Sequence, residues 1–279
     1  MKANYAFRNY RYWIWPLILF FCFSGCDSAK SLNGPRREYY SGGALRSSMN
    51  FINGKVEGVV LTYYESGAIR GRYNFKNGKQ QGWAQEFYEN GALERETSFK
   101  DDQVQGVIKT YYENGQFKGE AQSKDDKLIG VIREYYENGK LKSEIAMNDG
   151  RREGPAKEFH DNGILARELV YKNDKVNGPI TTYHEDGSLK GKAFSVDDHF
   201  EGVVQEFYPT GPLKSQYTYQ AGKRQGVSSE YYPNQQRKIE MFFKNDQLDG
   251  LVKMFNTKGE LKIEETYVDG KRVSAKKND

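Results

Sequence analysis

Residues 130–153 read GVIREYYENGKLKSEIAMNDGRRE and are one copy of a 24-residue repeat. Two glycines recur at this interval, without insertion or deletion, over about residues 34–273. The first series opens each repeat and consists of Gly34, Gly58, Gly82, Gly106, Gly130, Gly154, Gly178, Gly202, Gly226 and Gly250. The second consists of Gly43, Gly67, Gly91, Gly115, Gly139, Gly163, Gly187, Gly211 and Gly259, with Gln235 in the remaining place. So strict a period is typical of a repeat protein in which each copy packs on its neighbours.

We number the positions of the repeat from its first glycine. Position 6 is always aromatic, and its residues are Tyr39, Tyr63, Phe87, Tyr111, Tyr135, Phe159, Tyr183, Phe207, Tyr231 and Phe255. Position 7 is usually tyrosine, positions 8–10 read Glu-Asn-Gly in the cleanest copies, and a second turn signal such as Lys76-Asn77-Gly78-Lys79 occupies positions 19–22. Two short runs rich in aromatics and valine, separated and bounded by such turns, predict a β-hairpin.

The pairing register follows from the turn at positions 8–10. We expect a three-residue loop in which the glycine at position 10 takes a positive φ, because a residue with a Cβ atom adopts this conformation at a cost. Position 6 then faces position 12, which is apolar in nine of ten copies, and position 4 faces position 14, which is usually Gly or Ser. A two-residue loop would instead pair the tyrosine with a Lys or Arg at position 13.

The second strand of each repeat alternates between its two faces. In residues 141–147, Leu141, Ser143, Ile145 and Met147 share one face while Lys, Glu and Ala occupy the other. This period of two indicates a half-buried strand. The first strand carries apolar residues on both faces. The predicted fold class is therefore all-β, an elongated antiparallel β-hairpin meander of about ten stacked repeats over residues 34–273.

These residues resemble a known family. The pattern Gly-Val-x-x-x-Tyr-Tyr-Glu-Asn-Gly-x-Leu-Lys-x-Glu, closed by Lys-Asn-Gly-Lys-x-x-Gly, is similar to the bacterial variant of the MORN repeat, and it covers roughly 240 of the 279 residues. It departs from the eukaryotic form, which is richer in Gly-Tyr and Trp-Gly steps. The resemblance implies a sheet of stacked hairpins used for protein contacts or lipid association, and some relatives carry an antitoxin label.

The first 25 residues have the layout of a secretory signal peptide. Residues 1–12 carry three basic side chains and no acid, residues 13–23 are almost wholly apolar, and Ser24-Gly25-Cys26 follows. The cysteine resembles that of a lipobox, so we expect lipidation at Cys26, a tether over residues 26–33 and a membrane-anchored lipoprotein of the bacterial cell envelope. The alternative is an uncleaved transmembrane anchor, for which an 11-residue apolar run is shorter than the ~20 residues needed.

Charge and cysteine usage narrow the partners. The chain has 42 Lys and Arg against 38 Asp and Glu, and removal of the three basic residues in the signal leaves 39 against 38. Without a basic stripe we expect neither nucleic-acid binding nor polybasic binding to a membrane. Removal of Cys22 with the signal leaves Cys26 as the only thiol. Residues 274–279 form a basic C-terminal tail that we expect to be frayed.

We expect no catalytic site, no metal site and no cofactor. His160 and His184 share position 7 of adjacent repeats, about 10 Å apart, whereas zinc needs ligand nitrogens at ~2.0–2.1 Å from one ion. Acid pairs recur at positions 8 and 15, as in Glu113 and Glu120, and a feature that is repeated lacks the special environment that separates catalytic pKa values. No P-loop, dinucleotide or Gly-x-Ser-x-Gly motif is present.

The residues at position 7 form the candidate interaction surface. Its members are Tyr64, Tyr88, Tyr112, Tyr136, His160, His184, Tyr208 and Tyr232. One interpretation is structural, with these side chains packing between neighbours and stiffening the sheet. The other is functional, because a regular row of aromatics suits an extended partner or a repeating polymer. The two histidines would then mark a polar break in the surface.

The sequence therefore predicts a lipid-anchored envelope protein that is not an enzyme and whose array is a protein-interaction scaffold. The first alternative is an array that binds cell-wall glycan or another envelope polymer. A second alternative is an antitoxin-like component of a toxin–antitoxin pair, which requires that the N-terminal signal be misread.

Overall fold

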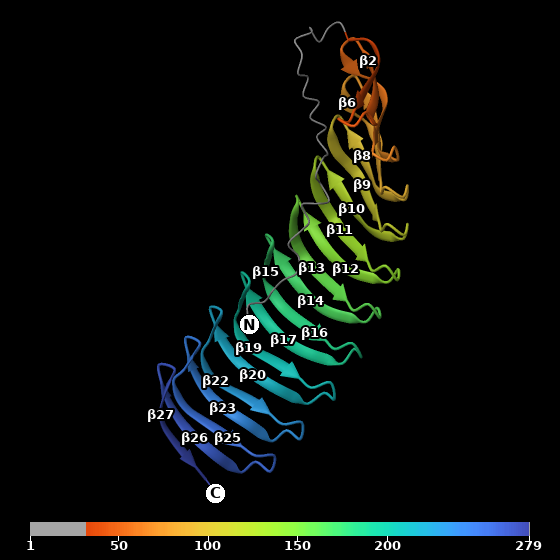
Figure 1. Cartoon of the computed structure of the whole chain (residues 1–279). Coiled ribbons are helices and arrows are strands. Elements are labelled where there is room, and N and C mark those ends of the chain that lie inside the picture. The colour runs from red at the N-terminus through yellow and green to blue at the C-terminus, as the bar shows by residue number, and fades with distance from the viewer. Residues whose placement is uncertain (1–31, 279) are drawn as a thin grey trace. The chain divides into compact units, whose positions relative to one another are not determined.

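The computed structural model describes residues 32–278, and every regular element among them is a β-strand. The 27 strands form one antiparallel meander (Figure 1), so the prediction of an all-β hairpin array is confirmed. Contacts divide the chain into two compact segments. The N-terminal segment runs to Leu141 and includes Ala146–Arg151; the C-terminal segment comprises Lys142–Ile145 and Arg152–Asp279.

Each repeat contributes a long hairpin, and in most repeats a two-residue strand comes before the next one. The N-terminal segment contains β1 (Gly34–Tyr39), β2 (Leu45–Ile52), β3 (Lys55–Val56), β4 (Gly58–Tyr63), β5 (Ile69–Lys76), β6 (Lys79–Gln80), β7 (Gly82–Phe87), β8 (Leu93–Lys100), β9 (Gln103–Tyr111), β10 (Phe117–Lys124) and β11 (Lys127–Tyr135). Strand β12 (Leu141–Asn148) has residues in both segments.

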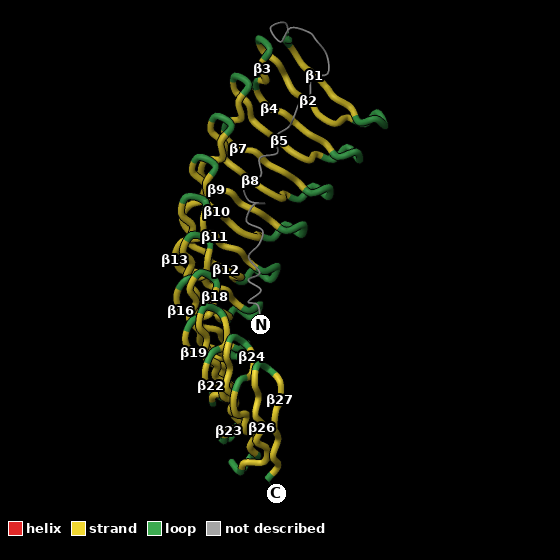
Figure 2. The backbone as a smooth tube through the Cα atoms, turned by 90° about the vertical axis from the view of Figure 1, so that its left-hand side faces the viewer, coloured by secondary structure: helices red, strands yellow, loops and turns green. Residues whose placement is uncertain are grey.

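The C-terminal segment continues the same pattern, and Arg151 of its first strand is assigned to the N-terminal segment. Its strands are β13 (Arg151–Phe159), β14 (Leu165–Lys172), β15 (Lys175–Val176), β16 (Gly178–Tyr183), β17 (Leu189–Val196), β18 (His199–Phe200), β19 (Gly202–Phe207), β20 (Leu213–Gln220), β21 (Lys223–Arg224), β22 (Gly226–Tyr231), β23 (Arg237–Lys244), β24 (Gln247–Leu248), β25 (Gly250–Phe255), β26 (Leu261–Val268) and β27 (Lys271–Lys277). Figure 2 shows the turns at the two opposite ends of the hairpins.

The first turn, at positions 8–10, has the predicted register. In the hairpin of β4 and β5, Tyr64 N–H donates to the carbonyl oxygen of Ala68, and Gly67 N–H donates to that of Tyr64, both at 2.9 Å. Gly67 has a φ of 88°, and Tyr63 at position 6 faces Ile69 at position 12. The three-residue loop with a glycine bulge is therefore confirmed. Gln235 adopts the same conformation, with a φ of 67°.

The prediction that position 4 faces position 14 is wrong. Position 5 is the partner, as in Thr62 opposite Gly71, because the register shifts between Thr62 and Tyr63. Arg70 is the extra residue on β5, so a bulge follows directly after the turn. Position 14 also pairs with position 5 of the next repeat, as in Gly71 opposite Glu86.

A further bulge explains the glycine at position 1. Phe75 pairs with Gln80, whereas Gly71 pairs with Glu86, so the strand of β6 and β7 holds two more residues than β5 over this stretch. Gln81 and Gly82 lie in this bulge, and Gly82 has a φ of 75°. A Cβ atom added to Gly82 would meet nothing within 4 Å. The backbone conformation, and not space, therefore requires the glycine.

One face of the hairpins is buried in both segments, and we call it the core face. Position 3 lies on it, with Val60, Ile108 and Ile132 at 0% exposure. Positions 16 and 18 supply further members. The buried apolar residues include Met49, Phe51, Tyr73, Ala84, Phe99, Val104, Ala121 and Leu128 in the N-terminal segment and Ala156, Leu169, Tyr171, Val176, Ile180, Met241, Phe243 and Val252 in the C-terminal segment. Burial of such a side chain contributes about 1.5–3 kcal/mol.

The C-terminal residues take part in the sheet. Strand β27 pairs with β26 from Lys271 opposite Val268 to Lys277 opposite Ile263, and all seven of its residues are exposed. Its register shifts by a single residue, Val273, where the other repeats have two extra residues and a glycine. Strand pairing thus continues beyond residue 273, at which we expected the array to end.

Candidate interaction surface

The side chains at position 7 join each repeat to the next. Every member of this row is half-buried. The Tyr64 hydroxyl donates to the carbonyl oxygen of Phe87 at 2.8 Å, and the Tyr112 hydroxyl donates to that of Tyr135 at 2.7 Å. Tyr88, Tyr208 and Tyr232 make the same bond to Tyr111, Tyr231 and Phe255. The acceptor is in each case position 6 of the following repeat.

The two histidines of the row make the equivalent contact. His160 Nε2 lies 3.1 Å from the carbonyl oxygen of Tyr183, and His184 Nε2 lies 3.2 Å from that of Phe207. Because a carbonyl can only accept, Nε2 carries the proton in both rings. Histidine therefore replaces tyrosine as a donor at this place. Within residues 32–278, no group of three or more His, Cys, Asp or Glu side chains is arranged to hold a metal ion.

This geometry favours the structural interpretation of the row, since each polar tip is used inside the array. Burial, the largest cause, raises the pKa of the Tyr64, Tyr88 and Tyr112 hydroxyls, which therefore stay protonated donors at neutral pH. Only the exposed parts of the rings remain for a partner. Binding of a partner by this row stays a prediction.

Replacing Tyr112 with phenylalanine tests the structural interpretation. The ring stays and the bond to the Tyr135 carbonyl is lost, so we expect the free energy of unfolding to fall by about 0.5–1.5 kcal/mol. Urea denaturation followed by circular dichroism measures the change. Tyr39→Phe is the control, because Tyr39 is 56% exposed and should change by less than about 0.5 kcal/mol. Equal stability of Tyr112→Phe and the wild type would contradict the role of the hydroxyl.

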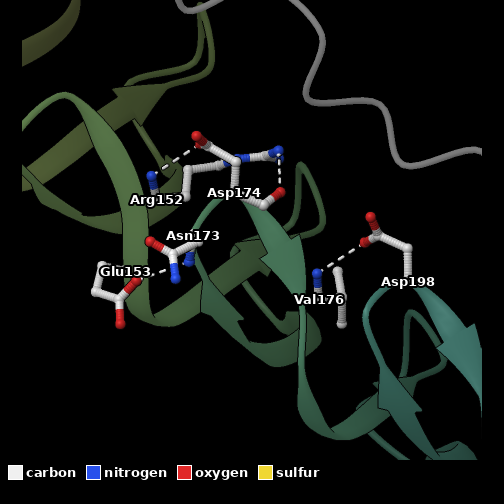
Figure 3. Close-up of polar contacts among 6 residues, drawn as sticks. All are labelled: Arg152, Glu153, Asn173, Asp174, Val176 and Asp198. Carbon is white, nitrogen blue, oxygen red and sulfur yellow. Dashed lines mark hydrogen bonds and ion pairs between the residues drawn. The ribbon is translucent and has the colours of Figure 1, made fainter.

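The second turns, at positions 20 and 21, form another line of contacts between repeats (Figure 3). Asp174 N–H donates to the carbonyl oxygen of Arg152 at 3.1 Å, and Asp174 Oδ1 accepts from Arg152 N–H at 2.9 Å. Glu153 Oε2 accepts from Asn173 N–H at 2.7 Å. Asn173 and Asp174 have φ values of 48° and 67°, as in a type I′ turn. Each carboxylate thus binds a backbone donor in the adjacent repeat.

The carboxylate at position 21 is tuned by these donors. The backbone N–H of Arg224 holds the pKa of Asp246 below its usual range; burial opposes this effect, and the Arg224 guanidinium lowers the pKa by a smaller amount. A carboxyl with a lowered pKa stabilises the fold above its unfolded-state pKa, and this contribution is lost as the pH falls through the folded-state pKa. The side chain of Asp246 is 48% exposed, so solvent weakens the effect.

Two substitutions at Asp198 distinguish the contribution of its carboxylate from the cost of its positive φ. Asp198 Oδ1 accepts from Val176 N–H at 2.7 Å (Figure 3), and Val176 is fully buried. Asp198→Ala leaves this N–H without its acceptor, and we expect the free energy of unfolding to fall by about 1–2 kcal/mol. Asp198→Gly should lose less, because glycine relieves the cost of the positive φ. Thermal unfolding of both variants measures this order, and the reverse order would contradict it.

The core face also contains acid–tyrosine and acid–arginine contacts. Glu86 Oε1 lies 3.5 Å from the Tyr73 hydroxyl, and Glu86 Oε2 lies 3.9 Å from Arg95 Nε. In the C-terminal segment the Tyr217 hydroxyl donates to Glu230 Oε1 at 2.7 Å. Burial raises the pKa of the Glu86 carboxyl and of both tyrosines. Similar contacts thus recur in different repeats.

A row of exposed apolar residues occupies position 2, and the sequence interpretation missed it as a surface. Its members are Pro35, Val59, Trp83, Val107 and Val131 in the N-terminal segment and Pro155, Pro179, Val203, Val227 and Leu251 in the C-terminal segment. Val59, Trp83 and Val227 are 50%, 48% and 53% exposed. We call it the exposed apolar row. Since position 3 is apolar and buried, strand alternation places position 2 on the opposite face, and this signal could have identified the row.

The neighbours of the exposed apolar row differ between the segments. Position 17 pairs directly with position 2, as in Trp83 opposite Ser98 and Val227 opposite Phe242. In the N-terminal segment, the residues that pair with position 2 are Asn50, Asn74, Ser98 and Gln122. In the C-terminal segment, the residues that pair with position 2 are Val170, Phe194, Thr218, Phe242 and Thr266. The surface is thus mixed in the first segment and mostly apolar in the second.

The fold and these repeated contacts define a β-hairpin repeat protein. Its family is the one described as MORN repeat variant, which matches residues 56–77, 80–101, 104–125, 128–149, 152–173, 200–221, 224–245 and 248–269. Because these stretches cover more than half of the chain, the chain belongs to this family. Residues 174–199 lie between two matches, and β15, β16 and β17 in this interval continue the same pattern of strands.

No curated protein matches the sequence. Among solved structures, the chain is similar to the crystal structure of TcdB2-TccC3-TEV, with 13% identity over 83% of this chain and 14% of the other, at a TM-score of 0.20. The crystal structure of TcdB2-TccC3 has 13% identity over 83% of this chain and 15% of the other, at a TM-score of 0.20. The structure of the Tc holotoxin pore of Photorhabdus luminescens has 13% identity over 87% of this chain and 14% of the other, at a TM-score of 0.18. The chain spans about a seventh of the length of those chains.

The part of the chain that the structure describes contains no helix with the length and hydropathy needed to cross a membrane. The predicted signal peptide and Cys26 lie outside the described residues.

Proposed function

We propose that this MORN-repeat protein is a non-catalytic protein-interaction scaffold, anchored by a lipid in the bacterial cell envelope. The observation that carries the proposal is the exposed apolar row, which presents an apolar side chain at the same place in every repeat. Exposed apolar patches of this kind mark interaction sites. A partner that lies along the row gains a small contact from each repeat, so binding is spread over several repeats.

The N-terminal segment is the part of the scaffold that suits a separate partner. Its row contains Trp83, and aromatic residues are enriched at interfaces. Polar residues such as Asn74 and Ser98 lie between its apolar members, and Asn74 Nδ2 already donates to the Trp83 carbonyl oxygen at 2.6 Å. A mixture of apolar and polar groups is typical of interfaces that form and separate.

Photocrosslinking in cells tests the partner. A photoreactive residue at Val59 or Val107 should form adducts with one or a few proteins, whereas the same residue at Glu65 in a first turn should not. Val59→Lys with Trp83→Lys should remove the adducts formed at Val107, because two charges would enter an apolar contact. Both sites are exposed, so circular dichroism should show an intact fold. Equal adducts at Val59 and Glu65 would overturn the proposal.

The anchor has its own test at Cys26. The proposal rests on the basic, apolar and Ser24-Gly25-Cys26 stretches of the first 26 residues. We expect metabolic labelling with a fatty-acid analogue to mark the mature protein, and intact mass to show that it begins at Cys26. Cys26→Ser should abolish the label and release the protein from the membrane fraction. An unlabelled wild type, or a mature chain beginning elsewhere, would refute lipidation.

Envelope glycan is the second candidate for the ligand. It is favoured by Trp83, which is 48% exposed and offers a ring face on which a sugar can stack. Purified cell-wall glycan should then retain the wild type and fail to retain Trp83→Ala. Retention of neither form would exclude glycan as the ligand, and retention of both would mean that Trp83 is not the residue that binds it.

A further inference from the structure

We propose that Asn77 and Gly78, in the second turn of the second repeat, form a site of spontaneous deamidation, and that the product weakens the contact of this turn with the preceding repeat. The modification converts the asparagine side chain to a carboxyl group without an enzyme. Asparagine is among the thermolabile residues of proteins, and a glycine that follows it leaves the backbone free to close a ring. The inference goes beyond the scaffold function and does not depend on it.

The reaction consumes water and releases ammonia. The backbone nitrogen of Gly78 attacks Cγ of Asn77, and the bond between Cγ and Nδ2 breaks. The proton of the attacking nitrogen is lost to solvent and the leaving nitrogen takes one up, so that ammonia departs and a succinimide ring remains. Water then opens the ring at either of its carbonyl carbons and gives aspartate or isoaspartate. The carboxamide must therefore be free to turn toward the glycine nitrogen.

Most Asn-Gly sequences of the chain hold the carboxamide in place. The dipeptide begins at Asn33, Asn53, Asn77, Asn90, Asn114, Asn138, Asn162 and Asn177. At Asn90 and Asn162, in first turns, Oδ1 accepts from the N–H two residues ahead at 2.8 and 2.9 Å. Their Nδ2 atoms donate to a carbonyl oxygen of the next repeat at 3.2 and 2.8 Å. The side chains that make at least one such bond are those of Asn33, Asn114, Asn138 and Asn177.

Asn53 and Asn77, both in second turns, differ from this group. Both residues are exposed, and within residues 32–278 neither carboxamide has a hydrogen-bond partner. The N–H of Gly78 donates to the Val56 carbonyl oxygen at 2.9 Å, and this bond must open before the ring closes. The first turns have the same obstacle, since Gly163 N–H donates to a carbonyl oxygen at 2.8 Å. The carboxamide contacts therefore make the difference between the two kinds of turn.

The product places a second carboxylate beside Glu57. Glu57 Oε2, at position 24 of the first repeat, accepts from Asn77 N–H at 2.6 Å. Figure 3 shows the equivalent pair, Glu153 and Asn173. In both pairs the acid faces an uncharged side chain. An aspartate in place of Asn77 brings two like charges together, which destabilises a contact between neighbouring strands.

Other repeats with an aspartate at position 20 show how this repulsion is avoided. Gln81 Nε2 donates to Asp101 Oδ1 at 2.7 Å, so an amide replaces the acid at position 24. The pairs that combine an amide with an aspartate are Gln81 with Asp101, Gln105 with Asp125, and Asn177 with Asp197. Two acids meet at Asp249 and Asp269, and there the bond from the backbone N–H is 3.4 Å long, against 2.6 Å at Glu57.

Peptide mapping by mass spectrometry tests the site. The purified full chain is incubated at mildly alkaline pH, and the mass increase from amide to acid is followed at each Asn-Gly sequence. We expect Asn53 and Asn77 to convert at least about 10-fold faster than Asn162, because two hydrogen bonds hold the Asn162 carboxamide. In urea the difference should vanish with the contacts that cause it. Equal rates in the folded protein, or a difference that persists in urea, would overturn the assignment.

Asn77→Asp and Asn53→Asp form a matched pair that tests the consequence. Asn77→Asp brings a carboxylate to Glu57, whereas Asn53 N–H is bonded by the uncharged Asn33 at 2.8 Å. In Asn77→Asp, we expect the hydrogen-exchange protection factors of residues 77 and 78 to fall about 2- to 5-fold. Those of residues 53 and 54 should not change in Asn53→Asp. Unchanged protection in Asn77→Asp, or an equal loss in both variants, would overturn the weakening by Glu57.

Discussion

Replacing Ile132 with alanine is expected to lower the free energy of unfolding by about 2–5 kcal/mol. Ile132 occupies position 3 on β11 and is 0% exposed. The substitution removes buried apolar surface and leaves a cavity, and the strands on either side cannot close it without giving up their backbone pairing. Urea denaturation of the full chain should show a lower midpoint with an unchanged m-value.

The control for this change is the adjacent residue. Val131 occupies position 2 and is 40% exposed on the opposite face. Val131→Ala should change the free energy of unfolding by less than about 0.5 kcal/mol. A similar loss from both substitutions would contradict the assignment of positions 2 and 3 to opposite faces.

The first turn could be predicted from the sequence in detail because its chemistry is local. A glycine at position 10 after Glu-Asn needs a positive φ, and a three-residue loop with that glycine sets which residues face each other. Tyr63 opposite Ile69 follows from this alone. The succession of hairpins follows as well, because the period of 24 has no interruption over residues 34–273, but the number of strands, 27 in the described part of the chain, does not.

The bulges could not be predicted, because alternation of apolar residues does not show where a strand holds an extra residue. Arg70 shifts the partner of position 14 by one residue, and the two-residue bulge at Gln81 and Gly82 splits one strand into β6 and β7. The glycine at position 1 did indicate an unusual backbone there. The sequence alone does not show whether such a glycine belongs to a turn or to a bulge.

The candidate interaction surface, too, could be predicted from the sequence only in part. The sequence identifies the position 7 row and its regular spacing, since both depend only on the period. The bonds that Tyr64 and His160 make to the next repeat depend on how far neighbouring hairpins lie apart, which no pattern contains. The exposed apolar row could have been predicted from the sequence, because apolar residues at positions 2 and 3 must point to opposite faces.

A side chain at Gly71, which occupies position 14, should clash with the Tyr73 ring as this ring lies in its repeat. A Cβ atom at Gly71 would lie 2.4 Å from the Tyr73 hydroxyl oxygen and 2.6 Å from two of its ring carbons. Tyr73 is 5% exposed, so its ring can move only by disturbing the core face. We expect Gly71→Ser to lower the free energy of unfolding by about 1–3 kcal/mol through overpacking, measured by urea denaturation.

The pair Gly71→Ser and Tyr73→Ile tests whether this loss comes from the ring. Positions 14 and 16 of another repeat hold this combination as Ser143 and Ile145, which are 2% and 0% exposed. Tyr73→Ile alone leaves space above Gly71, and the serine side chain partly fills that space in the double variant. The double variant should therefore be more stable than the sum of the single losses predicts, with a coupling of about 0.5–3 kcal/mol. Strictly additive losses would contradict the ring of Tyr73 as the cause of the loss in Gly71→Ser.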